Sequence, residues 1–255
     1  AEPGSMAELK AFEELQMDFA NQFELFFPDN LASKTVIIIP SLTLDQEVLS
    51  KIIGSMYYEE RLLCLLLLLR MPCTHITYVS SMPIDPIIID YYIHLLPGIT
   101  GFHARERLTL LSCYDASSIS LTEKILQRKR LMKRIKQSIQ PGHVAHIACF
   151  NTTHFERTLS VLLDVPIYGC DPCLIHLGTK SGSRRLFLKA GITMPPGAEN
   201  LYSYDDIVHA VAALKDMYPA LKKAVIKMND GFSGDGNAII KYPELENTRE
   251  LYDWI

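Results

Sequence analysis

Ala224-Val-Ile-Lys-Met-Asn-Asp-Gly-Phe-Ser-Gly-Asp-Gly-Asn237 is the stretch that decides how this chain folds. Its short apolar run leads to Lys227, which stands just before a loop of glycines and small polar residues. Glycines let the backbone approach an anion closely and point several N–H groups at it, while a lysine at the end of the preceding strand adds a positive charge. The stretch therefore predicts a loop that binds phosphate groups.

The order of these residues excludes a Walker A loop, in which the lysine and a Ser or Thr follow the glycines and open a helix. Here the lysine comes first, and the loop leads into residues 238–242, an apolar run that predicts a second strand. A strand, a glycine loop and a second strand together predict a flap over a nucleotide.

A second segment, residues 177–197, supplies a lysine, a predicted helix and the run Ala190-Gly-Ile-Thr-Met-Pro-Pro-Gly197. With the glycine loop, this segment resembles the ATP-grasp superfamily. The closest resemblance is to the carboxylate–amine and peptide ligases that carry a Rossmann-like pre-ATP-grasp domain in front. The resemblance extends from residue 35 to residue 237. It implies that ATP is the cofactor and that the substrates are a carboxylate and an amine.

The resemblance also implies roles for individual residues. In this family the first lysine contacts the α-phosphate side of ATP, the second contacts the α- and β-phosphates, and the glycine loop closes over the β- and γ-phosphates. By position, these roles fall to Lys180, to Lys227 and to the loop residues Gly231, Phe232, Ser233, Gly234, Asp235, Gly236 and Asn237.

The family also uses Mg²⁺, and its acidic ligands lie downstream of the flap. The sequence stops at Ile255, so we expect these ligands to lie in a part absent from it, and we assign no metal ligand here. Four acidic residues do follow the flap, but their helical spacing beside two leucines predicts a solvated helix face. They are Glu244, Glu246, Glu250 and Asp253.

The composition is that of a globular cytoplasmic protein. The chain has 255 residues, is 48% hydrophobic and has a net charge of −4, which disfavours binding to nucleic acid or to anionic membranes. The leucine run of residues 62–69 is far shorter than the roughly 20 residues needed to span a bilayer, so it predicts a buried helix end. Residues 1–5 look like an expression scar, and no signal peptide is visible.

Cysteine usage also fits a reducing compartment, because most of the six cysteines lie in apolar or strand-like runs. Cys170-Asp-Pro-Cys173, with His176 nearby, is the exception. A structural metal needs four ligands and a redox pair usually opens a helix, and neither context is present. We interpret this motif as a turn between domains.

Apolar runs that predict strands alternate with helical patterns, as in a parallel sheet covered on both faces. We therefore predict an α/β fold: a Rossmann-like pre-ATP-grasp domain (residues 35–177) followed by a truncated ATP-grasp α+β domain (residues 178–255). Residues 1–34 precede both and include a helix. Predicted strands are residues 35–40, 74–80, 107–113 and 143–150. Predicted helices are residues 44–69, 85–96, 154–163 and 180–190, with two more after the capping residues Ser120 and Ser203.

Other motifs have simpler interpretations. Basic residues at positions 128–136 could bind RNA or a membrane, but they lie on the polar side of an amphipathic helix that we expect to be solvated. Residues 40–43, 80–82 and 151–153 follow predicted strands and could line a ligand crevice at the carboxyl edge of the sheet. Helix caps and turns are the alternative, and we favour it for each of the three.

The sequence supports one main functional hypothesis and one alternative. The chain is the N-terminal part of an ATP-dependent carboxylate–amine ligase that acts through an acyl-phosphate, and is inactive as this fragment. Alternatively, it is a non-catalytic nucleotide-binding or protein-interaction module. An RNA-binding scaffold ranks third. An unpaired sheet edge at residues 238–242 leads us to expect self-association into a homo-oligomer.

Overall fold

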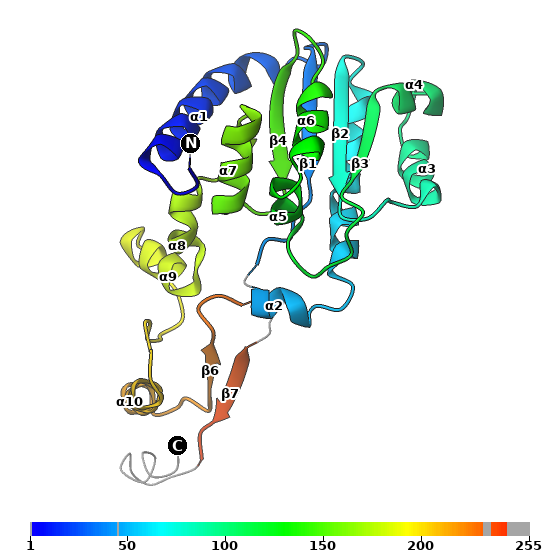
Figure 1. The fold of residues 1–255 in the computed structure, drawn as a ribbon. Helices are drawn as coiled ribbons and strands as arrows, with labels where there is room; N and C mark the ends of the chain where they lie inside the picture. Colours follow the sequence, from blue (N-terminus) through cyan, green and yellow to red (C-terminus); the bar gives the residue numbers. More distant parts are fainter. Residues whose placement is uncertain (1, 45, 232–235, 244–255) are drawn as a thin grey trace. The chain divides into compact units, whose positions relative to one another are not determined.

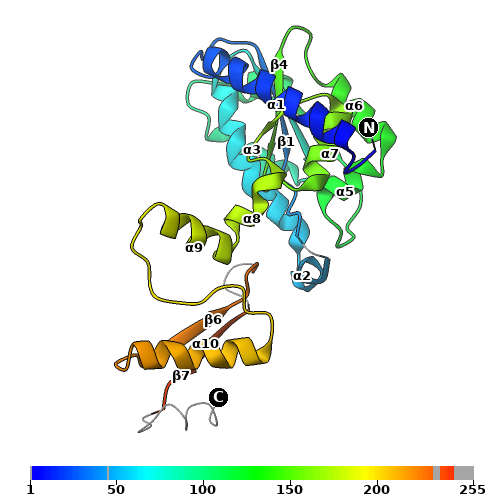
Figure 2. The same ribbon diagram turned by 90° about the vertical axis from the view of Figure 1, so that its left-hand side faces the viewer.

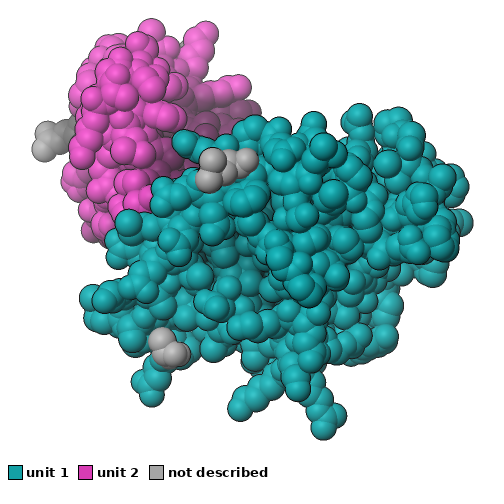
Figure 3. All heavy atoms as spheres, turned by 90° about the horizontal axis from the view of Figure 1, so that it is seen from above, with its two compact units in different colours: residues 1–172 teal, residues 173–255 magenta. Residues whose placement is uncertain are grey.

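The computed structural model describes residues 2–44, 46–231 and 236–243 of the chain. The chain divides into two compact units, unit 1 with residues 1–172 and unit 2 with residues 173–255, which Figure 3 shows in different colours. The domain boundaries that we place at residues 34 and 177 stay predictions.

Unit 1 is built on a sheet of five strands in which all neighbouring strands are parallel (Figure 1). Its strand order is β3 (Leu108–Ser112), β2 (Thr74–Ser80), β1 (Lys34–Ile39), β4 (Val144–Cys149) and β5 (Ile167–Tyr168). The central strand β1 is buried along its whole length, as expected for a β-branched run inside a parallel sheet. The predicted α/β class is therefore confirmed.

Helices cover both faces of this sheet, and alternate residues of β1 contact the two layers. One layer contains α1 (Met6–Phe26), α5 (Leu121–Leu126), α6 (Lys129–Gln137) and α7 (His154–Leu163). The other contains η1 (Ser55–Arg70), α3 (Pro86–His94) and α4 (Gly101–Glu106). Ile37 and Ile39 pack in the first apolar cluster, whereas Val36 and Ile38 pack in the second. The strand thus lies at the centre of three layers.

The β5 edge of the sheet is covered by α1, which crosses in front of it in Figure 2. Gln16 Nε2 donates to the backbone oxygen of Ile167 at 3.0 Å, and the Ile167 N–H donates to Gln16 Oε1 at 2.8 Å. This side-chain amide makes the two hydrogen bonds that the backbone of a further strand would make. Further along the helix, Phe19 stacks on His146 of β4, with 5.5 Å between the ring centroids.

The prediction of one continuous helix over residues 44–69 is wrong, because the structure has two separate helices there. α2 (Gln46–Lys51) is short, Gly54 adopts the left-handed conformation with φ 68°, and the 3₁₀ helix η1 follows. The fully buried leucines of η1 recur at every third residue, which is the period of a 3₁₀ helix. They are Leu63, Leu66 and Leu69. The leucine run is therefore fully buried along one side only, rather than being the buried helix end that we expected.

Helices begin at the capping residues of the local sequence, unless the capping side chain bonds to a residue far away in the sequence. Ser120 and Thr153 form complete capping boxes at the starts of α5 and α7. Thr43-Leu-Asp-Gln46 has the sequence of a capping box for the predicted helix 44–69, but the Thr43 hydroxyl donates to Glu156 Oε1 at 2.6 Å. The helix that we expected to continue from Ser120 ends at Leu126, and α6 begins after a short break.

α6 has the amphipathic character that its sequence predicts. It buries Leu131 and Ile135 against the sheet. Its basic side chains are exposed: Lys129, Arg130, Lys133, Arg134 and Lys136. In the part of the chain that the structure describes, no helix combines the length and apolar character that a membrane crossing requires.

Unit 2 contains a helical segment and a two-stranded antiparallel hairpin. The short turn η2 (Pro172–Leu174) leads into it. Its elements are α8 (Ile175–Gly178), α9 (Lys180–Lys189), α10 (Tyr204–Met217), β6 (Lys223–Lys227) and β7 (Asn237–Lys241). α10 packs on one face of the hairpin through a small cluster around Val211 and Tyr242. The Tyr242 hydroxyl donates to the backbone oxygen of Val211 at 2.8 Å, which fixes the helix to the end of β7.

Candidate functional site

The two candidate lysines of unit 2 come from elements that are joined by a single asparagine. The backbone N–H of Lys180 donates to the backbone oxygen of Asn229 at 3.2 Å, and the Ser181 N–H donates to Asn229 Oδ1 at 2.9 Å. Asn229 lies two residues after Lys227. These bonds hold the first turn of α9 against the chain that leaves β6, so the structure brings the backbones at Lys180 and Lys227 together.

The first turn of α9 is also fixed from the other side. Thr179 caps the helix, with its hydroxyl accepting from the Gly182 N–H at 3.0 Å. A Cβ at Gly182 would lie 2.0 Å from the backbone oxygen of His176, so only glycine fits there. The position of Lys180 therefore follows from backbone contacts on both sides.

The glycine loop closes where Met228 faces Gly236. Lys227 pairs with Asn237 in the hairpin register, and the Met228 N–H donates to the backbone oxygen of Gly236 at 3.1 Å. Gly236 has φ 71°, and a Cβ there would lie 2.3 Å from Met228 Sδ. Gly231 is exposed. Four of the predicted loop residues lie outside the described part of the chain: Phe232, Ser233, Gly234 and Asp235.

The hairpin presents an open face on the side away from α10. Lys227 and Val225 of β6 lie on it, and Val225 is directly opposite Ile239 of β7. Val225 is 52% exposed and Ile239 is 66% exposed. An apolar pair thus lies beside a lysine and the glycine loop. Our sequence reasoning did not single out this pair, although period-two alternation along each strand could have found it.

Residues 195–197, the Pro-Pro-Gly run of the segment 177–197, lie against the side chain of Arg184. Arg184 of α9 pairs with Glu199 at 2.6 Å and donates two hydrogen bonds of 3.1 Å to the backbone oxygen of Pro195. A Cβ at Gly197 would lie 3.2 Å from the guanidinium group, a tight contact. The motif therefore holds the chain that leaves α9 in place.

Within residues 2–44, 46–231 and 236–243, no group of three or more His, Cys, Asp or Glu side chains is placed to hold a metal ion. The acidic residues Glu244, Glu246, Glu250 and Asp253 lie outside these ranges, so the solvated helix face predicted for them stays a prediction. Cys170 and Cys173 are exposed and form no disulfide bond with another described cysteine, and His176 Nδ1 lies 3.0 Å from the backbone oxygen of Cys173.

In unit 1, two of the loops that could line a crevice bond to each other instead. The Thr43 N–H donates to Asn151 Oδ1 at 3.0 Å, and Asn151 Nδ2 donates to the backbone oxygen of Thr43 at 2.6 Å. These loops follow β1 and β4, where the strand order reverses and doubly wound folds usually bind ligands. Glu156 accepts from Thr43 and from Thr153, which caps α7. The cap interpretation is therefore confirmed at Thr153, which caps α7, whereas the Thr43 side chain bonds to Glu156 of α7.

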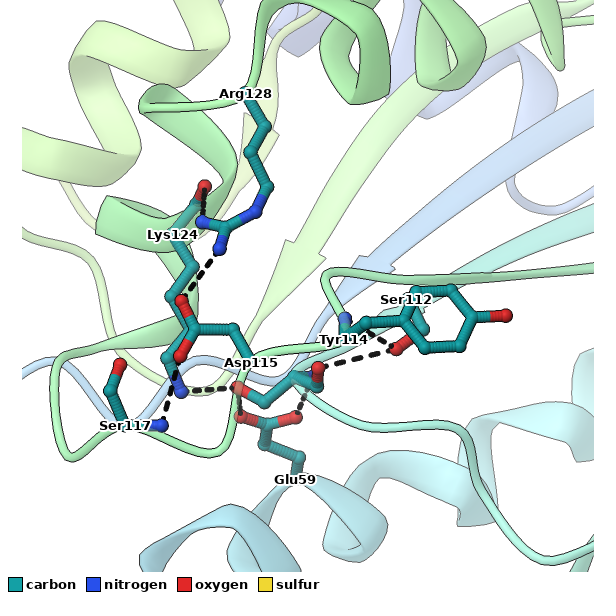
Figure 4. Close-up of polar contacts among 8 residues, drawn as sticks. Glu59, Ser112, Tyr114, Asp115, Ser117, Lys124 and Arg128 are labelled. Carbon is teal, nitrogen blue, oxygen red and sulfur yellow. Dashed lines mark hydrogen bonds and ion pairs between the residues drawn. The ribbon is translucent and has the colours of Figure 1, made fainter.

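The third loop contributes to a buried charged group at the same edge (Figure 4). The Ser81 hydroxyl donates to Glu59 Oε1 at 2.5 Å and its N–H donates to Glu59 Oε2 at 2.5 Å. Lys124 Nζ donates to Ser81 Oγ at 2.8 Å. Burial raises the pKa of Glu59 and lowers that of Lys124. The sequence offered no signal for this pair, because only the topology brings η1 and α5 together.

Comparison with known proteins identifies unit 2. Residues 173–253 match the family model described as IQCH-like, ATP-grasp. Unit 2 is an ATP-grasp-related domain. The match begins at the first residue of the compact unit, and the resemblance that we found in the sequence is confirmed.

Two curated relatives align with both units of the chain. IQ motif-containing protein H from Danio rerio is 25% identical over 232 residues, which cover 85% of this chain and 22% of the relative. L-propargylglycine–L-glutamate ligase from Streptantibioticus cattleyicolor is 25% identical over 245 residues, covering 92% of this chain and 50% of the ligase. The chain thus spans half or less of the length of these relatives. No solved structure matches it.

Proposed function

We propose that this chain is the N-terminal part of an ATP-dependent carboxylate–amine ligase that acts through an acyl-phosphate, with ATP bound in unit 2. One observation carries the proposal: Asn229 ties the start of α9 to the glycine loop, so Lys180 and Lys227 flank one loop. In this view residues 35–177 are the pre-ATP-grasp domain and residues 178–255 are the first portion of the ATP-grasp domain. A cytoplasmic location belongs to the same proposal.

The chemistry of the residues fits a triphosphate. The Lys227 and Lys180 side chains supply positive charge, and the loop from Gly231 to Asn237 supplies backbone N–H donors, which together neutralise phosphate oxygens. The apolar pair Val225 and Ile239 offers a surface for a nucleotide base beside them. Transfer of the γ-phosphoryl group to a carboxylate depends mainly on positioning and charge neutralisation, which these groups support.

Mg²⁺ would neutralise the remaining phosphate charge during transfer. The described residues of the site are lysines, amides and apolar side chains, and these suit phosphate rather than Mg²⁺, which prefers carboxylate oxygens. We therefore assign no metal ligand and no step through the metal to the described residues.

The second candidate is a nucleotide-binding or protein-interaction module without catalysis. It is favoured by the family model, which is IQCH-like, and by a relative that is named for an IQ motif rather than for an activity. Both candidates need the same phosphate contacts. They differ in whether bound ATP is turned over when carboxylate and amine substrates are present.

Binding of a fluorescent ATP analogue tests the shared part of the proposal. We expect Lys227→Ala and Lys180→Ala each to weaken binding about tenfold, since a hydrogen bond to a charged group contributes about 1.5–3 kcal/mol. Lys189→Ala is the matched control, because Lys189 is an exposed lysine at the far end of α9. Equal affinity of all three variants and the unmodified chain would contradict the site.

ADP release then separates the two candidates. For this chain alone we expect no magnesium-dependent ADP release with or without substrates. If the longer form from the same gene releases ADP only when a carboxylate and an amine are both present, it is a ligase. Binding without turnover in the longer form would favour the module.

Self-association through β7 is a further part of the proposal. Among the described residues, β7 pairs only with β6, so its other edge has no partner strand there. Ile239 of β7 is exposed. Unpaired strand edges with apolar side chains promote pairing between chains. Light scattering at rising protein concentration should show a dimer that Ile239→Lys weakens, and a strict monomer would rule the association out.

A further inference from the structure

β3 is the outermost strand on one side of the sheet of unit 1 (Figure 1). Gln16 bonds to the backbone of β5 at the opposite edge, whereas β2 is the only strand that pairs with β3 among the described residues. Thr109 and Leu110, in the middle of β3, are exposed. The sheet therefore has an open edge at β3.

The hydrogen bonds between β3 and β2 show which backbone groups of β3 face outward. The Ile76 N–H of β2 donates to the backbone oxygen of Arg107 at 2.8 Å, and the Cys113 N–H donates to the backbone oxygen of Ser80 at 2.9 Å. Because alternate residues of a parallel strand bond to the same neighbour, the residues between these two that face β2 are 109 and 111. The outward groups have no hydrogen-bond partner among the described residues. They are the N–H and C=O groups of Leu108, Leu110 and Ser112.

The sequence of β3 lacks the features that usually protect an edge strand. Natural edges carry a charged residue, a proline or a bulge, or a neighbouring segment covers them. Leu108-Thr-Leu-Leu-Ser-Cys113 has neither a charge nor a proline, and it pairs with β2 in an unbroken register. The outer edge of β3 is therefore suited to pair with a further strand.

Exposed aromatic side chains precede and follow this strand. Tyr114 adopts the left-handed conformation with φ 53°, which is uncommon for a residue other than glycine. Its ring points away from Asp115 and Lys124 in Figure 4, and the residue is 75% exposed. Phe102 of α4, the helix that leads into β3, is 69% exposed. Tyrosine and phenylalanine are enriched at protein interfaces, so both residues favour a protein partner.

We propose that β3 pairs antiparallel with β3 of a second copy of this chain, centred on Leu110. Residue 108 of each copy then pairs with residue 112 of the other, and the two Leu110 residues pair with each other. Every outward N–H and C=O group of β3 gains a partner across a two-fold axis. The Leu110 side chains, each 43% exposed in a single copy, lie side by side. This contact lies in unit 1, so it depends neither on the nucleotide site nor on the association proposed for β7.

The charges next to β3 favour the antiparallel direction. Arg105 stands three residues before β3, and Asp115 stands three residues after it. Each pairs within its own chain, with Asp90 and with Arg128. In an antiparallel pair the start of one strand lies beside the end of the other, so Arg105 of one copy comes near Asp115 of the second copy. A parallel pair would bring like charges together instead, which destabilises strand pairing.

Hydrogen exchange measured by NMR at low and high protein concentration tests the proposal. Ile239→Lys is the starting protein, because this change weakens the association proposed for β7. The contact involves one strand and a few side chains, so we expect a weak dimer that buries less than about 1,200 Å² in total. At high concentration the N–H groups of Leu108, Leu110 and Ser112 should exchange about tenfold more slowly, and those of Thr109 and Leu111 should not change. Exchange of the three outward groups that is independent of concentration would overturn the proposal.

Two variants of the starting protein locate the contact. Leu110→Lys and Leu162→Lys are matched, since the two leucines are 43% and 47% exposed and receive the same charge. Leu110→Lys places like charges opposite each other at the two-fold axis, so the concentration-dependent protection of Leu108 and Ser112 should be lost. Leu162→Lys, on α7, should retain it. Retained protection in folded Leu110→Lys, or protection confined to residues outside β3, would also count against the proposal. If Leu110→Lys does not fold, the concentration series on the starting protein decides.

Discussion

The two units of this chain differ in how far their strands and loops are buried and bonded to other residues of the chain. In unit 1 the central strand is buried on both faces, and Thr43, Asn151 and Glu156 bond to one another at the carboxyl edge. In unit 2 one face of the hairpin packs on α10, while the other exposes Val225 and Ile239 beside lysines. Unit 1 is thus stabilised by its own contacts, whereas the open face of unit 2 is suited to contact with another molecule.

The largest expected difference is in the cost of deleting an isoleucine. Ile37→Ala in β1 should lower the free energy of unfolding by about 2–5 kcal/mol, because it leaves a cavity in a fully buried cluster. Ile239→Ala removes the same atoms from the open face of β7 and should cost about 0.5 kcal/mol or less. Urea unfolding followed by circular dichroism measures both. Equal costs would mean that the open face is covered in the protein.

The free energy of unfolding of unit 1 should depend on pH through its buried histidine, His146. Burial, and to a lesser extent the charge of Lys34, lowers the pKa of His146 to about 4. The unfolded chain takes up this proton near pH 6.5, so stability that is complete above that pH is lost as the pH falls toward about 4, by about 3 kcal/mol. His146→Phe should remove this loss, and His94→Gln, which changes an exposed histidine, should retain it. The test is the difference between the unfolding free energies at pH 7 and pH 4.5 in each variant. The same difference in His146→Phe as in the unmodified chain would show that other groups cause the loss of stability.

A smaller effect is expected from the carboxylate that joins the β1 and β4 loops. Glu156→Ala leaves the Thr43 hydroxyl and the Thr153 N–H without their acceptor, which should cost about 2 kcal/mol. Glu123→Ala removes the corresponding capping-box residue of α5, whose carboxylate accepts from Ser120 and from no other residue that the structure describes, and should cost about 1 kcal/mol. Thermal unfolding compares the two variants. Equal losses would mean that the bond from Thr43 contributes nothing.

The smallest effect concerns the glycine hairpin of unit 2. Gly236→Ala and Gly142→Ala both place a side chain at φ above 70°, which should cost about 1 kcal/mol each. Only at Gly236 does the new Cβ meet Met228, so only there should the Met228 N–H exchange faster with solvent. Hydrogen exchange measured by NMR tests this. Protection of Met228 that is unchanged in Gly236→Ala would show that the hairpin closes without this contact.

Features that depend on neighbouring residues could be predicted from the sequence. The caps at Ser120 and Ser203 formed as expected, because donor and acceptor lie within one helical turn. The buried strands were recognisable because helices cover a parallel sheet on both faces, so its strands consist mostly of apolar residues. The two strands that flank the glycine loop were recognisable for a similar reason, since a hairpin is a local structure.

Features that depend on distant residues could not be predicted. Thr43 has the sequence of a cap, yet its hydroxyl bonds to a glutamate in another helix. The hydrogen bonds of Asn229 to α9 and the link from Lys124 to Glu59 through Ser81 join segments that only the fold brings together. The period of η1 was also missed, since an unbroken leucine run does not distinguish three residues per turn from 3.6.

The amide of Gln16 covers the backbone of unit 1's sheet at its β5 edge. By bonding to both polar groups of Ile167, it ends the sheet at β5 in the way that a paired strand would. Open sheet edges are templates for polymerisation, and one side chain on α1 closes this one. Gln16→Leu would keep the helix in place and leave the Ile167 backbone unpaired. The protection of this edge from pairing with another chain thus comes from a helix, which contributes no strand to the sheet.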